Sequence, residues 1–284
     1  MPLVLFGGSV TTLGAGMAVE GWLVAEGHFL LAFPVDEWFR DLATFVERRS
    51  ARVKVLTVSS LAAICMQGTL GGFRVLESSP QLAFLHGALA HGVFALLACI
   101  AVYFSRAWLT AQRSPVAPVT TATTDPTRLV AFTAVLVYAQ IVIGAWYRHT
   151  QATLGLALHV LLALAVVGLV TTAALALGAA AEQRRQTGTP GEEQRILRAA
   201  RGRLIALVWI QVGLGLLTML MIFQVSGGPE GAVSAGEAVF ATLHVGVGAA
   251  LLAQCGASWM WARRLAPRGQ DARGLAPVTA VGGR

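Results

Sequence analysis

Three histidines of this chain lie inside long apolar stretches, where ionisable side chains are uncommon: His86, His159 and His244. A short pattern of the form QxxφG, in which φ is an apolar residue, precedes each of them. The pattern reads QGTLG, QIVIG and QVGLG, and it begins at Gln67, Gln140 and Gln211. An ionisable group in the hydrocarbon of a membrane is a functional candidate. Repetition of this kind is typical of a duplicated helix bundle.

Neutral imidazole is a good ligand for iron, and two histidines on facing helices can hold a haem between them. A zinc site is disfavoured, because no carboxylate or thiol accompanies the three histidines. A proton relay is a further option, although the central parts of these stretches contain no Asp or Glu. For one histidine alone, an interhelical hydrogen bond is an equally good explanation. Three histidines at similar depth in the outer part of the bilayer favour ligation.

Three other polar residues near these stretches have two possible roles each. Arg74, Arg148 and His149 lie at the outer ends of apolar stretches, where they would either bind haem propionates or anchor the chain at the interface. His91 comes five residues after His86, so it is expected on a different helix face. The three repeat glutamines are predicted to form hydrogen bonds between helices, and the glycines to let backbones approach closely.

The elements that would position these residues are membrane helices. Of 284 residues, 56% are hydrophobic and only 12% are charged, and the mean hydropathy is +0.67. Apolar runs of about 20 residues predict an all-α integral membrane protein. The expected spans are 3–19, 54–72, 82–105, 128–147, 153–180, 203–224 and 236–262. The first is marginal in length, and the three cysteines lie in apolar runs, which supports no disulfide.

Lys and Arg predict the orientation. If the spans alternate from residue 54 onward, 18 of the 21 basic residues fall on one side, which places that side and the C-terminus in the cytoplasm. The net charge of +7 therefore reflects membrane topology rather than nucleic-acid binding. One crossing is missing between Glu47 and Arg48 unless the first span inserts backwards.

Several blocks of the chain, in order and spacing, resemble the haem A synthase family of cytochrome oxidase assembly proteins. These blocks are GGSVTTLGAGMAV, QGTLGGFRV with LAFLHGALAH, QIVIGAWYRHTQATL with LHVLLALAV, and QVGLGLLTM with ATLHVGVGAALLA. The resemblance implies eight helices in two similar four-helix halves. It implies that His159 and His244 bind haem b and that His86 is the ligand on the substrate side. The reaction implied is oxidation of a methyl group of haem O to a formyl group, which gives haem A.

The resemblance breaks down near the N-terminus. Glu47 matches the glutamate of the family's second-helix motif and is the expected catalytic residue, but RRSARVK follows it in place of the histidine motif. The second family helix and part of the first are therefore missing, which leaves about seven spans. The expected domains are an incomplete N-terminal half-bundle, 1–115, a C-terminal four-helix bundle, 116–265, and a disordered cytoplasmic tail, 266–284.

The family further implies a location in the inner membrane of a prokaryote. It implies haem b as the cofactor and haem O as the substrate. The expected partners are membrane lipid and haem O synthase, with a homo-oligomer as a further option. Two alternatives remain open at this point. One is a haem-binding membrane protein without synthase activity, and the other is a proton-coupled, transporter-like bundle.

Overall fold

The computed structural model describes residues 24–25, 28–29, 51–111, 125–186, 191–228 and 232–266. Within these ranges the chain is helical apart from short turns and two strands of two residues, β1 (Val24–Ala25) and β2 (His28–Phe29), which pair antiparallel. The expected first span, Glu47 and the tail beyond residue 266 lie outside the described residues.

Six of the described helices are long and apolar enough to cross a membrane. They are α3 (Ala51–Leu76), α4 (Pro80–Tyr103), α6 (Pro126–Thr150), α7 (Thr153–Gln186), α8 (Glu192–Leu220), which the π-helical turn η3 (Met221–Val225) continues, and α9 (Ala235–Leu265). A short helix, α5 (Arg106–Thr110), follows α4. The prediction of an all-α membrane protein is confirmed, and each predicted span from residue 54 onward corresponds to one helix.

Local sequence explains where several of these helices begin. The side chain of Ser79 accepts a hydrogen bond from the Leu82 N–H at the start of α4, and Asp125 accepts one from Thr127 at the start of α6. Each of these caps is followed by proline, which suits the first helical position because it has no N–H to satisfy. Ser234 caps α9 by accepting from the Glu237 N–H. These caps fix the N-terminal ends of α4 and α9, which carry His86 and His244.

The loop predicted between residues 181 and 203 is largely helical, because α7 continues to Gln186 and α8 begins at Glu192. The residues there are mainly Ala, Glu, Gln and Arg, which favour helices even outside the hydrocarbon. Arg184 joins the extensions: its Nη1–H donates to Glu193 Oε2 at 3.0 Å, and its Nη2–H donates to the Leu265 carbonyl at 2.6 Å. The ends of α7, α8 and α9 are thereby held together.

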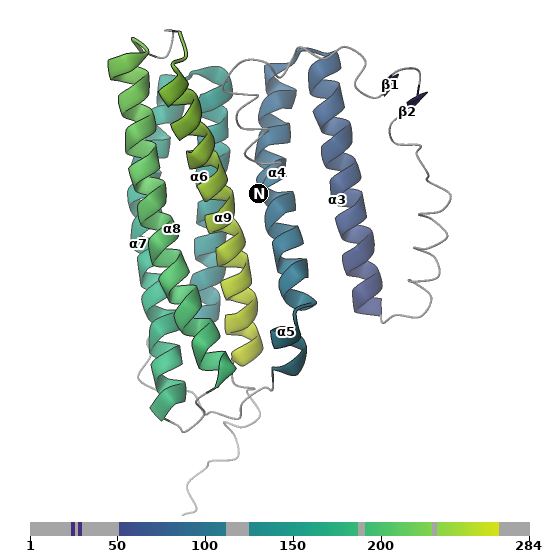
Figure 1. Ribbon diagram of the computed structural model, residues 1–284, viewed down its shortest axis with the longest axis vertical. Coiled ribbons are helices and arrows are strands. Elements are labelled where there is room, and N and C mark those ends of the chain that lie inside the picture. The colour runs from purple at the N-terminus through teal and green to yellow at the C-terminus, as the bar shows by residue number, and fades with distance from the viewer. Residues whose placement is uncertain are drawn as a thin grey trace, which may run out of the picture.

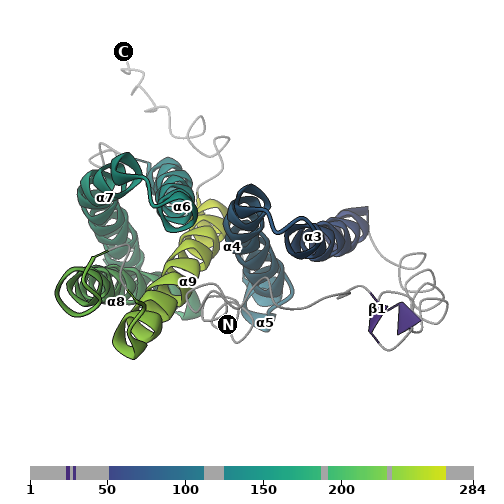
Figure 2. The ribbon, with the colours of Figure 1, turned by 90° about the horizontal axis from the view of Figure 1, so that it is seen from above.

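The helices form a four-helix bundle with two further helices on one side (Figures 1 and 2). In the bundle α6 packs on α7, α7 on α8 and α8 on α9, and α9 closes the ring against α6. Helix α4 packs against both α6 and α9, while α3 packs extensively only against α4 among the described elements. As Figure 2 shows, α3 therefore lies at the edge of the assembly.

Tight packing is concentrated at one end of the bundle. The fully buried side chains there include Val130, Val170, Leu177, Leu204 and Cys255. Toward the other end the packing loosens: α6 buries no residue after Val137, and α8 buries none after Val208. Helix α7 buries only Gly155 before Val166. The loosely packed part is called the outer half below.

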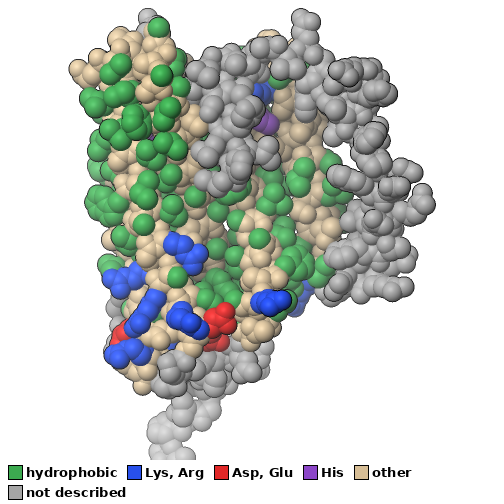
Figure 3. All heavy atoms as spheres, viewed as in Figure 1, with side chains coloured by type: hydrophobic (Ala, Val, Ile, Leu, Met, Phe, Trp, Pro, Cys, Tyr) green, Lys and Arg blue, Asp and Glu red, His purple; other side chains and the backbone are tan. Residues whose placement is uncertain are grey.

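Arginines gather at the tightly packed end (Figure 3). The last turns of α7 and α9, which finish at this end, carry Arg184 and Arg185, and Arg263 and Arg264, respectively. Helices α3 and α6 run the opposite way, and their last turns place Arg74 and Arg148 at the other end. This distribution follows the alternation predicted from the sequence.

Candidate functional site

A unit of glutamine, glycine and histidine recurs in three helical hairpins, α3–α4, α6–α7 and α8–α9. In each, the imidazole lies directly on the glycine of the preceding helix. A Cβ added to the glycine would lie 2.8 Å from the ring at Gly71, 2.7 Å at Gly144 and 3.0 Å at Gly215. The rings concerned belong to His86, His159 and His244, respectively. The sequence predicted that these glycines let neighbouring helix backbones approach closely. In the structure, the space beside each glycine is filled by the imidazole ring of the next helix.

Backbone carbonyls orient two of these rings. His159 Nδ1 lies 3.1 Å from the Gln140 carbonyl oxygen, and His244 Nδ1 lies 3.2 Å from that of Gln211. With the proton on Nδ1, each ring donates to a carbonyl and carries its lone pair on Nε2; in His244 this lone pair accepts from the Gln211 amide at 3.1 Å. A hydrogen bond from Nδ1 to a carbonyl is usual for a histidine that ligates a metal through Nε2, because it fixes the tautomer and the ring direction.

The rings of His159 on α7 and His244 on α9 are neighbours, with centroids 6.2 Å apart and planes inclined by 70°. An imidazole nitrogen binds a transition metal at about 2 Å, and the ring centre lies roughly 1 Å further back, so two imidazoles on opposite sides of one ion have centres about 6 Å apart. Rotation of one ring about the common axis leaves this distance unchanged. The centroid separation therefore matches that of two axial ligands on one metal ion.

The side-chain amides of the repeat glutamines complete the site. Their Oε1 atoms, in Gln67, Gln140 and Gln211, are buried and have no hydrogen-bond partner in the described part of the chain. Gln140 Nε2 donates to the His159 carbonyl at 2.8 Å, whereas Gln211 Nε2 lies 3.1 Å from His244 Nε2. Metal binding at His244 would therefore require the Gln211 amide to turn away. The sequence predicted hydrogen bonds between helices here, and the structure contains them.

His86 is placed differently from the other two histidines. The amide nitrogen of Gln67 lies 3.1 Å from His86 Nδ1 and also donates to the His86 carbonyl at 3.0 Å. Arg74 and His149 lie close enough to interact electrostatically with this ring or with each other. The structure thus brings Arg74, His86 and His149 together at the outer ends of α3, α4 and α6. The sequence associated His86 with the substrate side, and Arg74 and His149 with either haem propionates or anchoring at the interface.

Arg148 lies near both the His86–His149 group and the His159–His244 pair, because its charge acts on His149 and on His244. Its charge also acts on His91 of α4, and Glu237 is an acidic neighbour. A carboxylate of the protein thus already interacts with this guanidinium. His91 itself is buried, and its Nδ1–H donates to the Gly87 carbonyl of its own helix at 2.7 Å. This bond satisfies one ring nitrogen within the helix.

Over the described ranges, no three or more His, Cys, Asp or Glu side chains gather as metal ligands. A metal held by His159 and His244 would thus need further ligands from a cofactor such as a porphyrin, whose four ring nitrogens leave two axial positions. Comparison with family models, curated proteins and solved structures finds no match to this chain. The function must therefore be argued from the site itself.

Proposed function

We propose that this protein is a membrane haem protein in which His159 and His244 are the axial ligands of a resident haem b. The spacing of the two rings, 6.2 Å between centroids, carries this proposal. The Nδ1 hydrogen bonds to carbonyls support it, because they fix the tautomer in which Nε2 carries the lone pair.

The packing of the bundle agrees with a planar group in the outer half. Helices α6 and α8 bury no side chains there, although the same helices are tightly packed at the basic end. The apolar side chains of the outer half would cover the faces of a porphyrin. Bound haem would supply one-electron transfer, while the protein orients the ligands and excludes water.

We further propose a reaction of the haem A synthase type, oxidation of a methyl group of haem O to a formyl group. The sequence blocks around the three histidines support it. The position of Arg74 beside His86 and His149 supports it too, because a guanidinium group binds carboxylates such as haem propionates. Haem O would reach the site from the inner membrane of a prokaryote, supplied by haem O synthase, and the basic end with the C-terminus would face the cytoplasm.

Pigment extraction tests the reaction. Cells that supply haem O and express the wild-type protein should accumulate haem A, and His86→Ala should leave haem O unconverted. Leu85→Ala is a matched control, because its side chain adjoins His86 in sequence and is 49% exposed. Haem A should form normally in this control. Persistence of haem O alone in wild-type cells would refute the reaction.

One observation favours a second candidate, a haem-binding membrane protein without synthase activity. Helix α3, which carries Gln67 and Gly71 beside His86, packs extensively only against α4 among the described elements, so this side of the His86 site is formed by a helix at the edge of the assembly. Displacement of a substrate by about 1 Å can already reduce a rate by orders of magnitude. The second candidate predicts haem b in the purified protein and no conversion of haem O.

A further inference from the structure

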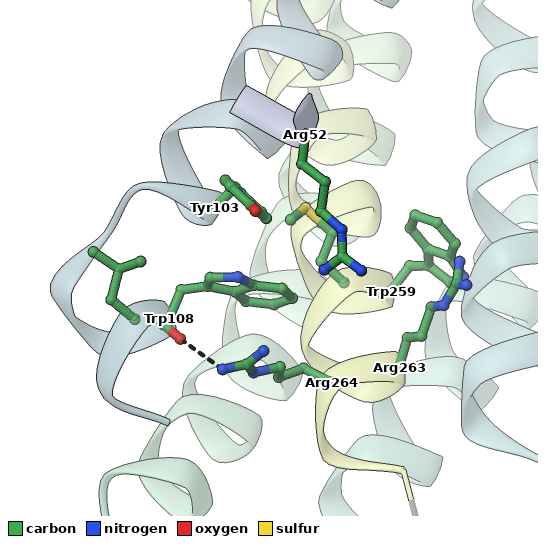
Figure 4. A pocket seen from close by; sticks show the side chains of 8 residues that line it. Arg52, Tyr103, Trp108, Trp259, Arg263 and Arg264 are labelled. Carbon is green, nitrogen blue, oxygen red and sulfur yellow. Dashed lines mark hydrogen bonds between the residues drawn. The ribbon is translucent and has the colours of Figure 1, made fainter. Parts of the chain in front are cut away.

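A pocket of about 490 Å³ opens at the basic end of the molecule, far along the helices from the histidines. It lies between the start of α3, the α4–α5 corner and the last turns of α9 (Figure 4). Its lining combines cationic and aromatic side chains: Arg52, Tyr103, Trp108, Trp259, Arg263 and Arg264. Nothing in the haem proposal uses these residues.

Among the described residues, no carboxylate forms an ion pair with an arginine of this pocket. The ion pairs in that part of the chain involve Arg128, Arg184, Arg185 and Arg198 instead. Arg52 reaches into the pocket from α3, as Figure 4 shows. Arg263 lies over the ring of Trp259, with 5.5 Å from its guanidinium carbon to the ring centroid. Two guanidinium groups are thus available for an anion.

The third arginine shapes the pocket. Arg264 donates to the carbonyls of Trp108 and Ala111, at 3.3 and 3.0 Å, and so ties α5 to α9. Its Nε–H is buried and has no hydrogen-bond partner among the described residues. Trp108 is held in turn by the buried Trp261, with ring centroids 5.1 Å apart. The wall is therefore preorganised and retains an unused donor.

The position of the pocket indicates the kind of anion. Tryptophan and tyrosine at the end of membrane helices mark the level of the lipid headgroups. Leu109, on the rim, is 65% exposed, which suits contact with acyl chains. A soluble anion would use the arginines but not this apolar rim. A phospholipid would use both, through its phosphate and its chains.

We propose that this pocket binds the phosphate of an anionic phospholipid from the leaflet at the basic end. Basic pockets between membrane helices on the cytoplasmic side are suited to such headgroups. Guanidinium groups bind phosphate through paired hydrogen bonds. The site is separate from the histidines, so its occupancy does not depend on haem.

Native mass spectrometry of the detergent-solubilised wild-type protein tests the lipid first. Titration with phosphatidylglycerol should give one bound lipid at concentrations at which phosphatidylcholine gives none, and millimolar inorganic phosphate should not displace it. Equal binding of the two lipids would overturn the proposal. Displacement by inorganic phosphate would show a site for free phosphate and would also overturn it.

Paired variants then test the location. Arg52→Gln with Arg263→Gln removes two charges from the pocket and should weaken phosphatidylglycerol binding on the order of tenfold. Arg195→Gln with Arg203→Gln removes two exposed charges at the same end, outside the pocket, and should leave it unchanged. Equal weakening in both would indicate general surface attraction and refute the site. Should the pocket variant fail to fold, Arg52→Lys with Arg263→Lys keeps the charge and must retain the preference for phosphatidylglycerol.

Discussion

At the scale of single residues, the site depends on glycines that accept a ring. An imidazole packed on a helix needs a position without a Cβ, and Gly144 and Gly215 provide it beneath His159 and His244. Any larger side chain would displace the ring, because a Cβ within about 3 Å of ring atoms is closer than van der Waals contact allows. These glycines therefore determine how the two imidazole rings are oriented.

Substitution of Gly215 tests this role. Gly215→Ala should reduce the haem content of the purified protein severalfold, because the His244 ring must shift. Gly213→Ala is the matched control: it lies on the same helix, and a Cβ there meets nothing within 4 Å. Haem per protein, measured as the pyridine haemochromogen, gives the result. Equal haem content in the two variants would contradict the role of Gly215 in leaving room for the His244 ring.

At the scale of elements, the basic end of the bundle is fastened by side chains as well as by apolar packing. Arg184 is 6% exposed and joins the ends of α7, α8 and α9 through Glu193 and the Leu265 carbonyl. The neighbouring Arg185 pairs with Glu182, but both side chains are largely in solvent. Only the buried pair is expected to matter for stability.

Arg184→Met should lower the thermal unfolding midpoint of the solubilised protein, at a cost of about 3 kcal/mol, because it leaves Glu193 and a carbonyl without their partner. Arg185→Met serves as the control and should shift the midpoint little, since its pair is solvated. Unfolding followed by loss of helical circular dichroism measures both. A similar midpoint for the two variants would contradict the role of Arg184.

Helix α3 should be the least protected of the long helices. It buries only Gly72 and packs extensively only against α4, whereas α9 buries twelve residues along its length. Hydrogen exchange in detergent should therefore proceed faster in the amides of 51–76 than in those of 235–265. Exchange at equal rates would show that α3 has contacts beyond those of the described elements.

The sequence predicted most elements but not how they meet. Apolar length and caps such as Ser79 and Asp125 locate α4 and α6, because these signals are local. The contact of His159 with Gly144 and the pairing of His159 with His244 depend on helix rotation, which apolar periodicity defines poorly when all faces are apolar. The sequence did not predict the arginine pocket at the basic end, because Arg52 and Arg263 were used only to predict the orientation in the membrane. The spacing of Trp259 and Arg263, one helical turn apart, could have indicated that their side chains lie together.

At the scale of the whole molecule, the two ends differ in charge and in packing. The basic end is tightly packed and contains the arginine pocket, while the outer half carries the three paired histidine and glycine units. Under the proposed function, this polarity would place haem chemistry on one side of the membrane and the basic surface on the other. The orientation that we propose has a direct test.

Single cysteines at Gly191 and Gly227 report the orientation in a background without Cys65, Cys99 and Cys255. Gly191 precedes α8 at the basic end, and Gly227 follows η3 at the opposite end. A membrane-impermeant maleimide added to intact cells should label Gly227→Cys and should label Gly191→Cys only after lysis. The reverse pattern would place the basic end outside.

The most direct test of the account is the reduced-minus-oxidised absorption spectrum of the purified protein. His159 and His244, with ring centroids 6.2 Å apart, should give the sharp bands of a six-coordinate haem b. His159→Ala and His244→Ala should each abolish these bands, while His91→Phe should keep them. Absence of haem from the wild-type protein, or bands that persist in both alanine variants, would contradict the proposed function.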